Sequence, residues 1–138
     1  MDKAPLVDKY RGTLRYLADL RDSGTPNGTV QLLARVFRGE LLSKASTAQL
    51  IDSMKQTTTF PTRLKGLLPA GTVVAHKTGS TGTVNGLTAA TNDSGVIFLP
   101  DQSQFAVSIY VKASTRSDSE RDRGYFARLS RAAFDFSR

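Results

Sequence analysis

The six residues 76–81 read His-Lys-Thr-Gly-Ser-Thr and bring several chemically useful groups together. Lys77 carries a positive charge, Thr78 and Ser80 carry hydroxyls, and Gly79 allows another group to approach the backbone. A cation beside hydroxyls suits a ligand with a carboxylate, and a backbone N–H next to a glycine can stabilise an oxyanion during acyl transfer. The alternative is a surface lysine ahead of a turn that Gly79 permits, and the tripeptide taken alone favours that alternative.

The sequence lacks the partners that would turn these groups into an acyl-transfer site. No serine is followed by a lysine three positions later, and neither Ser-Asp-Asn nor Tyr-x-Asn occurs. A serine nucleophile needs a base within about 3 Å. Lys77 and Ser80 diverge if they lie on one strand, so we do not expect Lys77 to activate Ser80. The sequence therefore predicts binding groups, with Lys77 in a supporting role, and no complete catalytic set.

The composition bounds the class of protein. The chain has 138 residues, of which 39% are hydrophobic, and this is enough for one domain with a core. No apolar stretch approaches the roughly 20 residues that a membrane span needs. Cysteine is absent and His76 is the single histidine, so we expect no disulfide, no metal and no cofactor. We interpret His76 as a structural residue.

The net charge of +7 raises the question of nucleic-acid binding. However, the arginines near the C-terminus alternate with acidic residues, as in "RSDSERDR", which is typical of a solvated helix face with local ion pairs. We therefore do not expect nucleic-acid binding to be the main function. Strongly salt-dependent binding would be its signature.

Helices are predicted in the first half of the chain. Residues 6–20 place apolar side chains at helical spacing, although Gly12 weakens this helix. Thr25 followed by Pro26 marks the start of a second helix. A third helix is predicted to start near Ser43. The residues that it is expected to bury are Leu50, Ile51 and Met54.

From Gly71 onward the apolar period changes from 3.6 to 2, which predicts three or four antiparallel strands. The Asn-Asp-Ser-Gly stretch at 92–95 is interpreted as a turn between two of them. The expected strands cover residues 72–80, 86–91, 96–100 and 104–113.

A closing helix is predicted after the last strand. Ser117 and Glu120 form a capping-box pattern at its start. Its apolar residues form one stripe that we expect to lie across one face of the sheet. The stripe consists of Tyr125, Phe126, Leu129, Ala132, Ala133 and Phe136.

The element order is that of an α+β fold, with N-terminal helices and a C-terminal helix packed on an antiparallel sheet. We divide the chain into an N-terminal helical segment of unclear origin, 1–24, and a region 25–138. The latter comprises helices over 25–70, the sheet over 71–114 and the closing helix over 117–137. A sheet this small has open edges and an uncovered face, which residues 6–20 or a partner must cover.

Residues 25–138 resemble the C-terminal part of class A serine β-lactamases and related penicillin-recognising enzymes. Four stretches carry the resemblance in order: "TPNG", "RLKGLLPAG", "HKTGS" and "SERDRGYFARLSRAAFDF". Lys-Thr-Gly is one of the motifs of these enzymes, together with Ser-x-x-Lys and Ser-Asp-Asn. The resemblance implies the C-terminal half of the β-lactamase/transpeptidase-like fold and a role in β-lactam hydrolysis, hence antibiotic resistance.

The resemblance also implies roles for single residues. Lys77 would help to hold the protonation state of the site and the β-lactam carboxylate, and Thr78 and Gly79 complete the motif. Ser80 matches a position whose hydroxyl binds the substrate carboxylate. Thr81 matches the strand-edge position whose backbone N–H, or that of its neighbour, forms half of the oxyanion hole.

In the family, the nucleophile, its lysine and the second serine come from a first half that these residues do not contain. That half also supplies two strands and a helix to the sheet. We therefore expect this chain to be inactive alone, and to need the missing half or a second copy, in a homodimer, to complete its sheet. The alternative is a non-catalytic, self-associating module derived from the same fold.

The location of the protein follows from two opposing indications. The family is exported to the periplasm or beyond. The first twelve residues lack the apolar core of a secretory signal, so we expect a cytoplasmic protein if Met1 is the native start.

Overall fold

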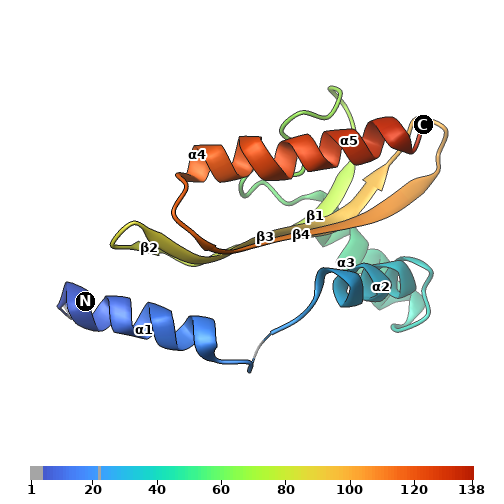
Figure 1. Ribbon diagram of the computed structural model, residues 1–138. Coiled ribbons are helices and arrows are strands. Elements are labelled where there is room, and N and C mark those ends of the chain that lie inside the picture. The colour runs from blue at the N-terminus through green and yellow to red at the C-terminus, as the bar shows by residue number, and fades with distance from the viewer. Residues whose placement is uncertain (1–4, 22) are drawn as a thin grey trace.

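A computed structural model describes residues 5–21 and 23–138. The sheet lies between helices on both sides, with α4 and α5 on one face and α1 and α2 on the other (Figure 1). The α+β fold with an antiparallel sheet and a C-terminal helix packed on it is confirmed. We call the two faces of the sheet the α5 face and the α2 face.

The three N-terminal helices are α1 (Leu6–Ala18), α2 (Pro26–Phe37) and α3 (Lys44–Lys55). The predicted starts of the second and third are confirmed. The hydroxyl of Thr25 accepts a hydrogen bond from Gly28 N at 3.0 Å, and the hydroxyl of Ser43 accepts one from Ser46 N at 3.2 Å. These bonds satisfy N–H groups that would otherwise have no partner in the first helical turn.

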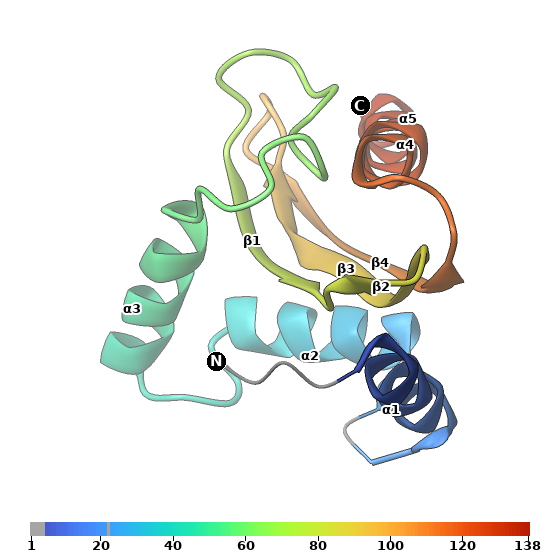
Figure 2. The same ribbon diagram turned by 90° about the vertical axis from the view of Figure 1, so that its left-hand side faces the viewer.

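These helices bury little surface. Helix α2 packs on the sheet through Leu33 and Val36, whereas none of the residues of α1 is buried. On α3 the buried residue is Thr47, and Leu50 is 38% exposed, so the prediction that Leu50 would be buried is wrong. The reason is position, because α3 lies beside the edge of the sheet at β1, rather than over it (Figure 2).

The strands are β1 (Val74–Ser80), β2 (Thr83–Val84), β3 (Leu87–Phe98) and β4 (Gln104–Ser114). All pairings are antiparallel, and β3 is the central strand that pairs with each of the others. Among the described residues, β1 and β4 therefore each have one edge without a strand partner.

The predicted turn at 92–95 is wrong, because these residues continue the single long strand β3. Each of them finds a partner within the sheet that a turn would not provide. Asn92 lies opposite Gly79, Asp93 bonds to His76, and Ser94 bonds to the hydroxyl of Ser108 at 2.7 Å. Gly95 is needed because a Cβ there would lie 2.6 Å from the Cβ of His76.

The closing helix has three parts, α4 (Asp118–Arg121), the π-helical η1 (Asp122–Ala127) and α5 (Arg128–Phe136). The capping box of Ser117 and Glu120 is confirmed.

The predicted apolar stripe of this helix is mostly wrong. Phe126 is buried as expected, but Tyr125, Leu129 and Phe136 are 41%, 55% and 93% exposed. The buried face is instead made of Phe126, Ala127, Ser130 and Phe134. The wider turns of η1 move the residues around the helix axis, so that a stripe drawn at 3.6 residues per turn no longer faces the sheet.

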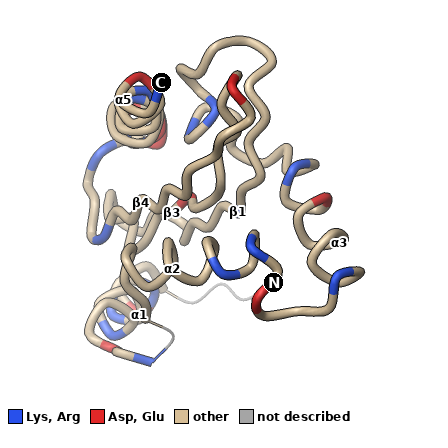
Figure 3. The backbone as a smooth tube through the Cα atoms, turned by 90° about the vertical axis from the view of Figure 1, so that its right-hand side faces the viewer, with Lys and Arg blue, Asp and Glu red and all other residues tan. Residues whose placement is uncertain are grey.

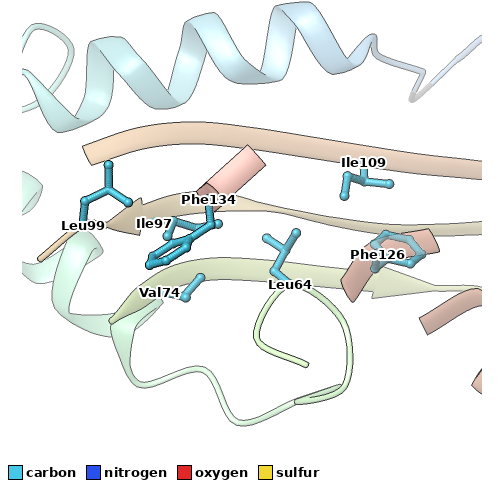
Figure 4. Close-up of a cluster of buried hydrophobic side chains, with 7 residues drawn as sticks. All are labelled: Leu64, Val74, Ile97, Leu99, Ile109, Phe126 and Phe134. Atoms are coloured by element: carbon cyan, nitrogen blue, oxygen red, sulfur yellow. The ribbon is translucent and has the colours of Figure 1, made fainter. Parts of the chain in front are cut away.

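The hydrophobic core lies between the sheet and α5 (Figure 4). It joins side chains from all three long strands, the closing helix and the loop before β1, and consists of Leu64, Val74, Ile97, Leu99, Ile109, Phe126 and Phe134. This core holds the loop 56–73 against β1, and β1 carries the residues of the candidate site.

Candidate functional site

The Lys-Thr-Gly-Ser stretch forms the last four residues of the edge strand β1. Side chains alternate along a strand, so Lys77 lies on the α2 face and Thr78 on the α5 face. Lys77 is exposed, whereas Thr78 is 5% exposed. The hydroxyl of Thr78 lies 2.7 Å from that of Thr59, in the loop before β1. The stretch therefore offers one exposed cation, whose Nζ donates to the carbonyl of Thr78, and one hydroxyl that Thr59 holds in the interior.

The hydrogen-bond pattern of β1 distinguishes the backbone of Ser80 from that of Thr81. The N–H of Thr81 donates to the carbonyl of Ala90 at 2.9 Å, so it belongs to the ladder with β3. Backbone groups of successive residues point to opposite sides of an antiparallel strand. The N–H of Ser80 therefore points to the outer edge of β1, away from β3.

Gly79 lies against the side chain of Asn92 on β3. A Cβ at this position would lie 2.7 Å from Oδ1 of Asn92, the residue directly opposite. The glycine thus lets the amide of Asn92 lie flat against β1. This packing accounts for a glycine here independently of any ligand.

Arg63 supports the same strand from the α5 face. It is 1% exposed, and its Nη1 donates to the carbonyls of Gly79 and Asn92, each at 3.0 Å. Its Nε donates to Asp122 of η1 at 2.9 Å, and its guanidinium stacks on the ring of Phe60, with 3.8 Å to the ring centroid. One side chain thereby ties the loop, two strands and the closing helix together.

A second buried polar pair, His76 and Asp93, lies in the interior beside the same strand. Nδ1 of His76 lies 2.8 Å from Oδ1 of Asp93, and both side chains are fully buried. Asp93 also accepts from Leu64 N at 3.3 Å, and the hydroxyl of Thr57 donates to the carbonyl of His76 at 2.7 Å. His76 thus lies in the interior on the opposite face from Lys77.

Sequence reasoning missed Arg63, Asp93 and Asp122. The partners of Arg63 lie 16, 29 and 59 residues away along the chain. No pattern of neighbouring residues in the sequence could therefore predict these contacts. Asp93 lies within the stretch Asn-Asp-Ser-Gly, whose composition is typical of a turn. The sequence therefore did not predict a buried strand residue at this position. The separation of Lys77 and Ser80 onto opposite faces agrees with the expectation that they do not form a nucleophile–base pair.

Further features of the described residues bear on the kind of site. Within 5–21 and 23–138, no group of three or more His, Asp or Glu side chains is placed to hold a metal ion. No helix in this part of the chain is long and apolar enough to cross a membrane. The basic residues are spread over helices, strands and loops (Figure 3).

Comparison with known proteins gives consistent matches. A family model described as the Beta-lactamase enzyme family matches residues 6–137. Extended-spectrum beta-lactamase PER-1 of Pseudomonas aeruginosa is 47% identical over 109 residues, which are 79% of this chain and 35% of that protein. A beta-lactamase of Bacteroides uniformis is 37% identical over 125 residues, 89% of this chain and 42% of that protein. The structure of TLA-3 extended-spectrum beta-lactamase matches with a TM-score of 0.80 at 48% identity, over 82% of this chain and 41% of that chain.

The fold is thus that of one part of a β-lactamase. The chain belongs to the class A β-lactamase family and corresponds to the C-terminal part of its members. The resemblance seen in the sequence is confirmed. The chain spans between 35% and 42% of the length of these relatives.

Proposed function

We propose that this chain supplies the substrate-binding wall of a class A β-lactamase-like serine hydrolase and does not hydrolyse β-lactams alone. The observation that carries the proposal is the placement of the Lys-Thr-Gly-Ser stretch. It lies at the open edge of β1, with the Lys77 side chain exposed and the Ser80 N–H directed outward. The nucleophile would come from a first part with Ser-x-x-Lys, a pattern that these 138 residues lack.

Each residue of the stretch has a role in this proposal. Lys77 attracts the β-lactam carboxylate and sets the charge of the site. Ser80 contributes a hydroxyl to the carboxylate, Thr78 holds the strand to the preceding loop through its bond with Thr59, and Gly79 keeps β1 close to β3. The N–H of Ser80, rather than that of Thr81, is the oxyanion donor, because the Thr81 N–H is already bonded to Ala90.

A chimera tests the binding role. Residues 25–138 replace the matching segment of PER-1 from Pseudomonas aeruginosa, so that the rest of that protein supplies the first part. We expect hydrolysis of a chromogenic cephalosporin, and a loss of about 100-fold or more in kcat/KM on Lys77→Ala. Lys44→Ala, which removes an exposed cation on α3, is the matched control. A chimera in which both variants retain equal activity would contradict the role of Lys77.

The isolated chain tests the predicted inactivity. After incubation with excess penicillin, we expect an unchanged intact mass, and no coloured product from the cephalosporin. An acyl adduct on the pure chain would overturn the prediction, and peptide mapping would then identify the nucleophile, with Ser80 examined first.

The second candidate function is a non-catalytic module that associates with itself. It is favoured by two features of the described residues, the open edge of β4 and the exposed side chains of Tyr125, Leu129 and Phe136. In this form the second copy, rather than a missing first part, covers the sheet. Native mass separates the two, because a binding wall that awaits its first part remains monomeric alone.

A further inference from the structure

We propose that Arg63 is a positioning residue for acyl transfer, because it binds the carbonyl end of the peptide unit whose N–H end is the oxyanion donor. This inference rests on the proposed function and adds a residue that lies outside the Lys-Thr-Gly-Ser stretch. The peptide unit is the one that joins Gly79 to Ser80. Nη1 of Arg63 donates to its carbonyl oxygen at 3.0 Å, and the N–H of Ser80 is its other end.

The two ends of this peptide unit point in opposite directions. The bond from Thr81 N to the carbonyl of Ala90 makes Gly79 and Asn92 the next hydrogen-bonded pair of the ladder. The carbonyl of Gly79 therefore points toward β3. Because a trans peptide unit is planar, the N–H of Ser80 points the other way, to the outer edge of β1. A donor that fixes the direction of the carbonyl thereby fixes the direction of the N–H.

The guanidinium also changes the strength of the oxyanion donor. The Gly79 carbonyl accepts from the backbone of Asn92 in the ladder and from the charged Nη1 of Arg63. Hydrogen bonds from charged donors are about twice as strong as neutral ones, and bonds in a chain polarise one another. Electron density drawn toward the carbonyl oxygen makes the Ser80 N–H a stronger donor. Arg63 thus acts on the reacting oxygen through one peptide unit, without touching it.

The guanidinium is held in place by three further contacts. Nε of Arg63 donates to Asp122 at 2.9 Å, Nη1 also donates to the carbonyl of Asn92 at 3.0 Å, and the ring of Phe60 lies 3.8 Å away at its centroid. The side chain is 1% exposed. A donor fixed in this way needs no reorganisation when charge develops on the substrate, which is the condition for electrostatic catalysis.

The backbone of Phe60 is strained in the conformation that places this ring. Its φ is +47°, a region that bulky residues avoid, and the next residue is Pro61, before which an extended conformation is preferred. Phe60 also accepts a hydrogen bond from Arg63 N at 3.1 Å, which closes the turn. Strained residues persist where the surrounding structure holds them, and they cluster at functional sites. The strain at Phe60 therefore supports a positioning role for the contact between its ring and Arg63.

The kinetics of the chimera test this role. The double variant Arg63→Met, Asp122→Leu is used, because Arg63→Met alone leaves a buried carboxylate without a counter-charge. We expect kcat to fall about tenfold while KM changes less than about twofold, since the interaction is made in the transition state. The loss is smaller than the roughly 100- to 1,000-fold that removal of a whole oxyanion donor causes, because the Ser80 N–H remains.

The matched control is the double variant Arg131→Met, Asp135→Leu. Arg131 also combines an ion pair with a backbone contact, because its Nε donates to Asp135 at 2.8 Å and its Nη1 donates to the carbonyl of Leu67 at 3.2 Å. Leu67 lies in the same loop as Arg63 but not in β1. We expect kcat of this control to equal that of the unchanged chimera. Equal losses in the two double variants would overturn the role of Arg63.

A transition-state analogue separates this role from binding of the substrate carboxylate. Benzeneboronic acid carries no carboxylate, and its tetrahedral adduct with a serine places an oxygen where the oxyanion develops. We expect its inhibition constant to rise about tenfold in the Arg63→Met, Asp122→Leu chimera, in parallel with the fall in kcat/KM. A rise in KM alone, with unchanged inhibition by the boronic acid, would show that Arg63 binds the carboxylate instead and would overturn the proposal.

Nuclear magnetic resonance of the 138-residue chain tests the polarisation without any first part. A hydrogen bond to a carbonyl deshields its carbon and the nitrogen of the same peptide unit. We expect the Gly79 carbonyl carbon and the Ser80 nitrogen to move upfield in the Arg63→Met, Asp122→Leu chain, and to stay in place in the Arg131→Met, Asp135→Leu chain. Unchanged resonances in the first variant would rule out the polarisation.

The measurements distinguish failure of this inference from failure of the proposed function. A chimera that is inactive, or that is indifferent to Lys77→Ala, counts against the proposed function, and the resonances of Gly79 and Ser80 still decide whether Arg63 polarises their peptide unit. An active chimera that depends on Lys77 but retains its kcat in the Arg63→Met, Asp122→Leu variant would overturn the role of Arg63 alone.

Discussion

At the scale of single residues, the site depends on one buried arginine that no motif contains. Arg63 donates to the backbone of both strands beside Gly79 and pairs with Asp122. Its ion pair is 1% and 8% exposed at the two side chains, so solvent can replace neither partner. The stability of the Lys-Thr-Gly-Ser stretch therefore depends on a buried residue of the α5 face that lies outside the motif.

We expect Arg63→Met to lower the free energy of unfolding by about 3–5 kcal/mol, because it leaves Asp122 buried without a counter-charge. The double variant Arg63→Met, Asp122→Leu should recover most of this loss, since it removes both charges together. Urea unfolding measures both values. Arg131→Met, which breaks the exposed pair with Asp135, is the control and should change little. A double variant as unstable as the single one would show that packing, rather than the unpaired charge, dominates.

At the scale of elements, two glycines differ in whether the surrounding structure leaves room for a side chain. Gly95 lies in β3 against the backbone of β1, and its added Cβ would contact the carbonyl of Ala75 and the Cβ of His76. Gly12 lies within α1 with no atom within 4 Å of an added Cβ.

We expect opposite results from alanine at these positions. Gly95→Ala should lower the free energy of unfolding by about 1–3 kcal/mol, because β1 must move away from β3. Gly12→Ala should raise helix content, and stability by up to about 1 kcal/mol, because alanine is the better helix former. Circular dichroism and urea unfolding measure the two effects. Destabilisation by Gly12→Ala would mean that α1 packs more tightly than this structure indicates.

The start of the closing helix should respond to acid. The backbone N–H and hydroxyl of Ser117 bond to the Glu120 carboxylate and, with Arg116 nearby, lower the pKa of Glu120 from its usual 4.5. A carboxyl with a lowered pKa in the folded state contributes stability above its unfolded pKa, and this contribution disappears as pH falls through the folded value.

We therefore expect Glu120→Gln to be less stable than the unchanged chain at neutral pH, with the gap closing below about pH 4. Urea unfolding of both proteins at two pH values gives the gap directly. Other exposed acids with lowered pKa, such as Asp101 and Asp135, destabilise both proteins equally in acid and cancel in the difference. A gap that is the same at both pH values would mean that the amide caps the helix differently and that charge plays no part.

At the scale of the whole molecule, the excess of basic residues opposes the compact state. The basic residues among the described ones are spread over helices, strands and loops, so their repulsion is general and not relieved by any single neighbour (Figure 3). Most ion pairs are exposed, and such pairs contribute little to stability. The general repulsion should therefore exceed the sum of these local attractions.

We expect the unfolding temperature to rise by a few degrees when sodium chloride increases from about 0.02 M to about 0.3 M, because salt screens the repulsion. The measurement uses dilute protein, so that any dimer is dissociated throughout. A falling unfolding temperature would show that the exposed ion pairs outweigh the net charge.

The sequence by itself determined the features that depend on near neighbours. The caps at Thr25, Ser43 and Ser117 and the Lys-Thr-Gly strand all follow from residues within a few positions of each other. Family membership was also visible there, because the order and spacing of several stretches agree over more than half of the chain.

The tertiary structure decided what depends on residues far apart in the chain. It made residues 92–95 a strand, since Asp93, Ser94 and Gly95 each meet a partner on β1 or β4. The π-helical turns after Arg121 decided which side of the closing helix is buried, and thereby left Tyr125 and Leu129 exposed. Local patterns record intrinsic preference, whereas burial and pairing are free energies of contacts that exist only once the sheet has formed.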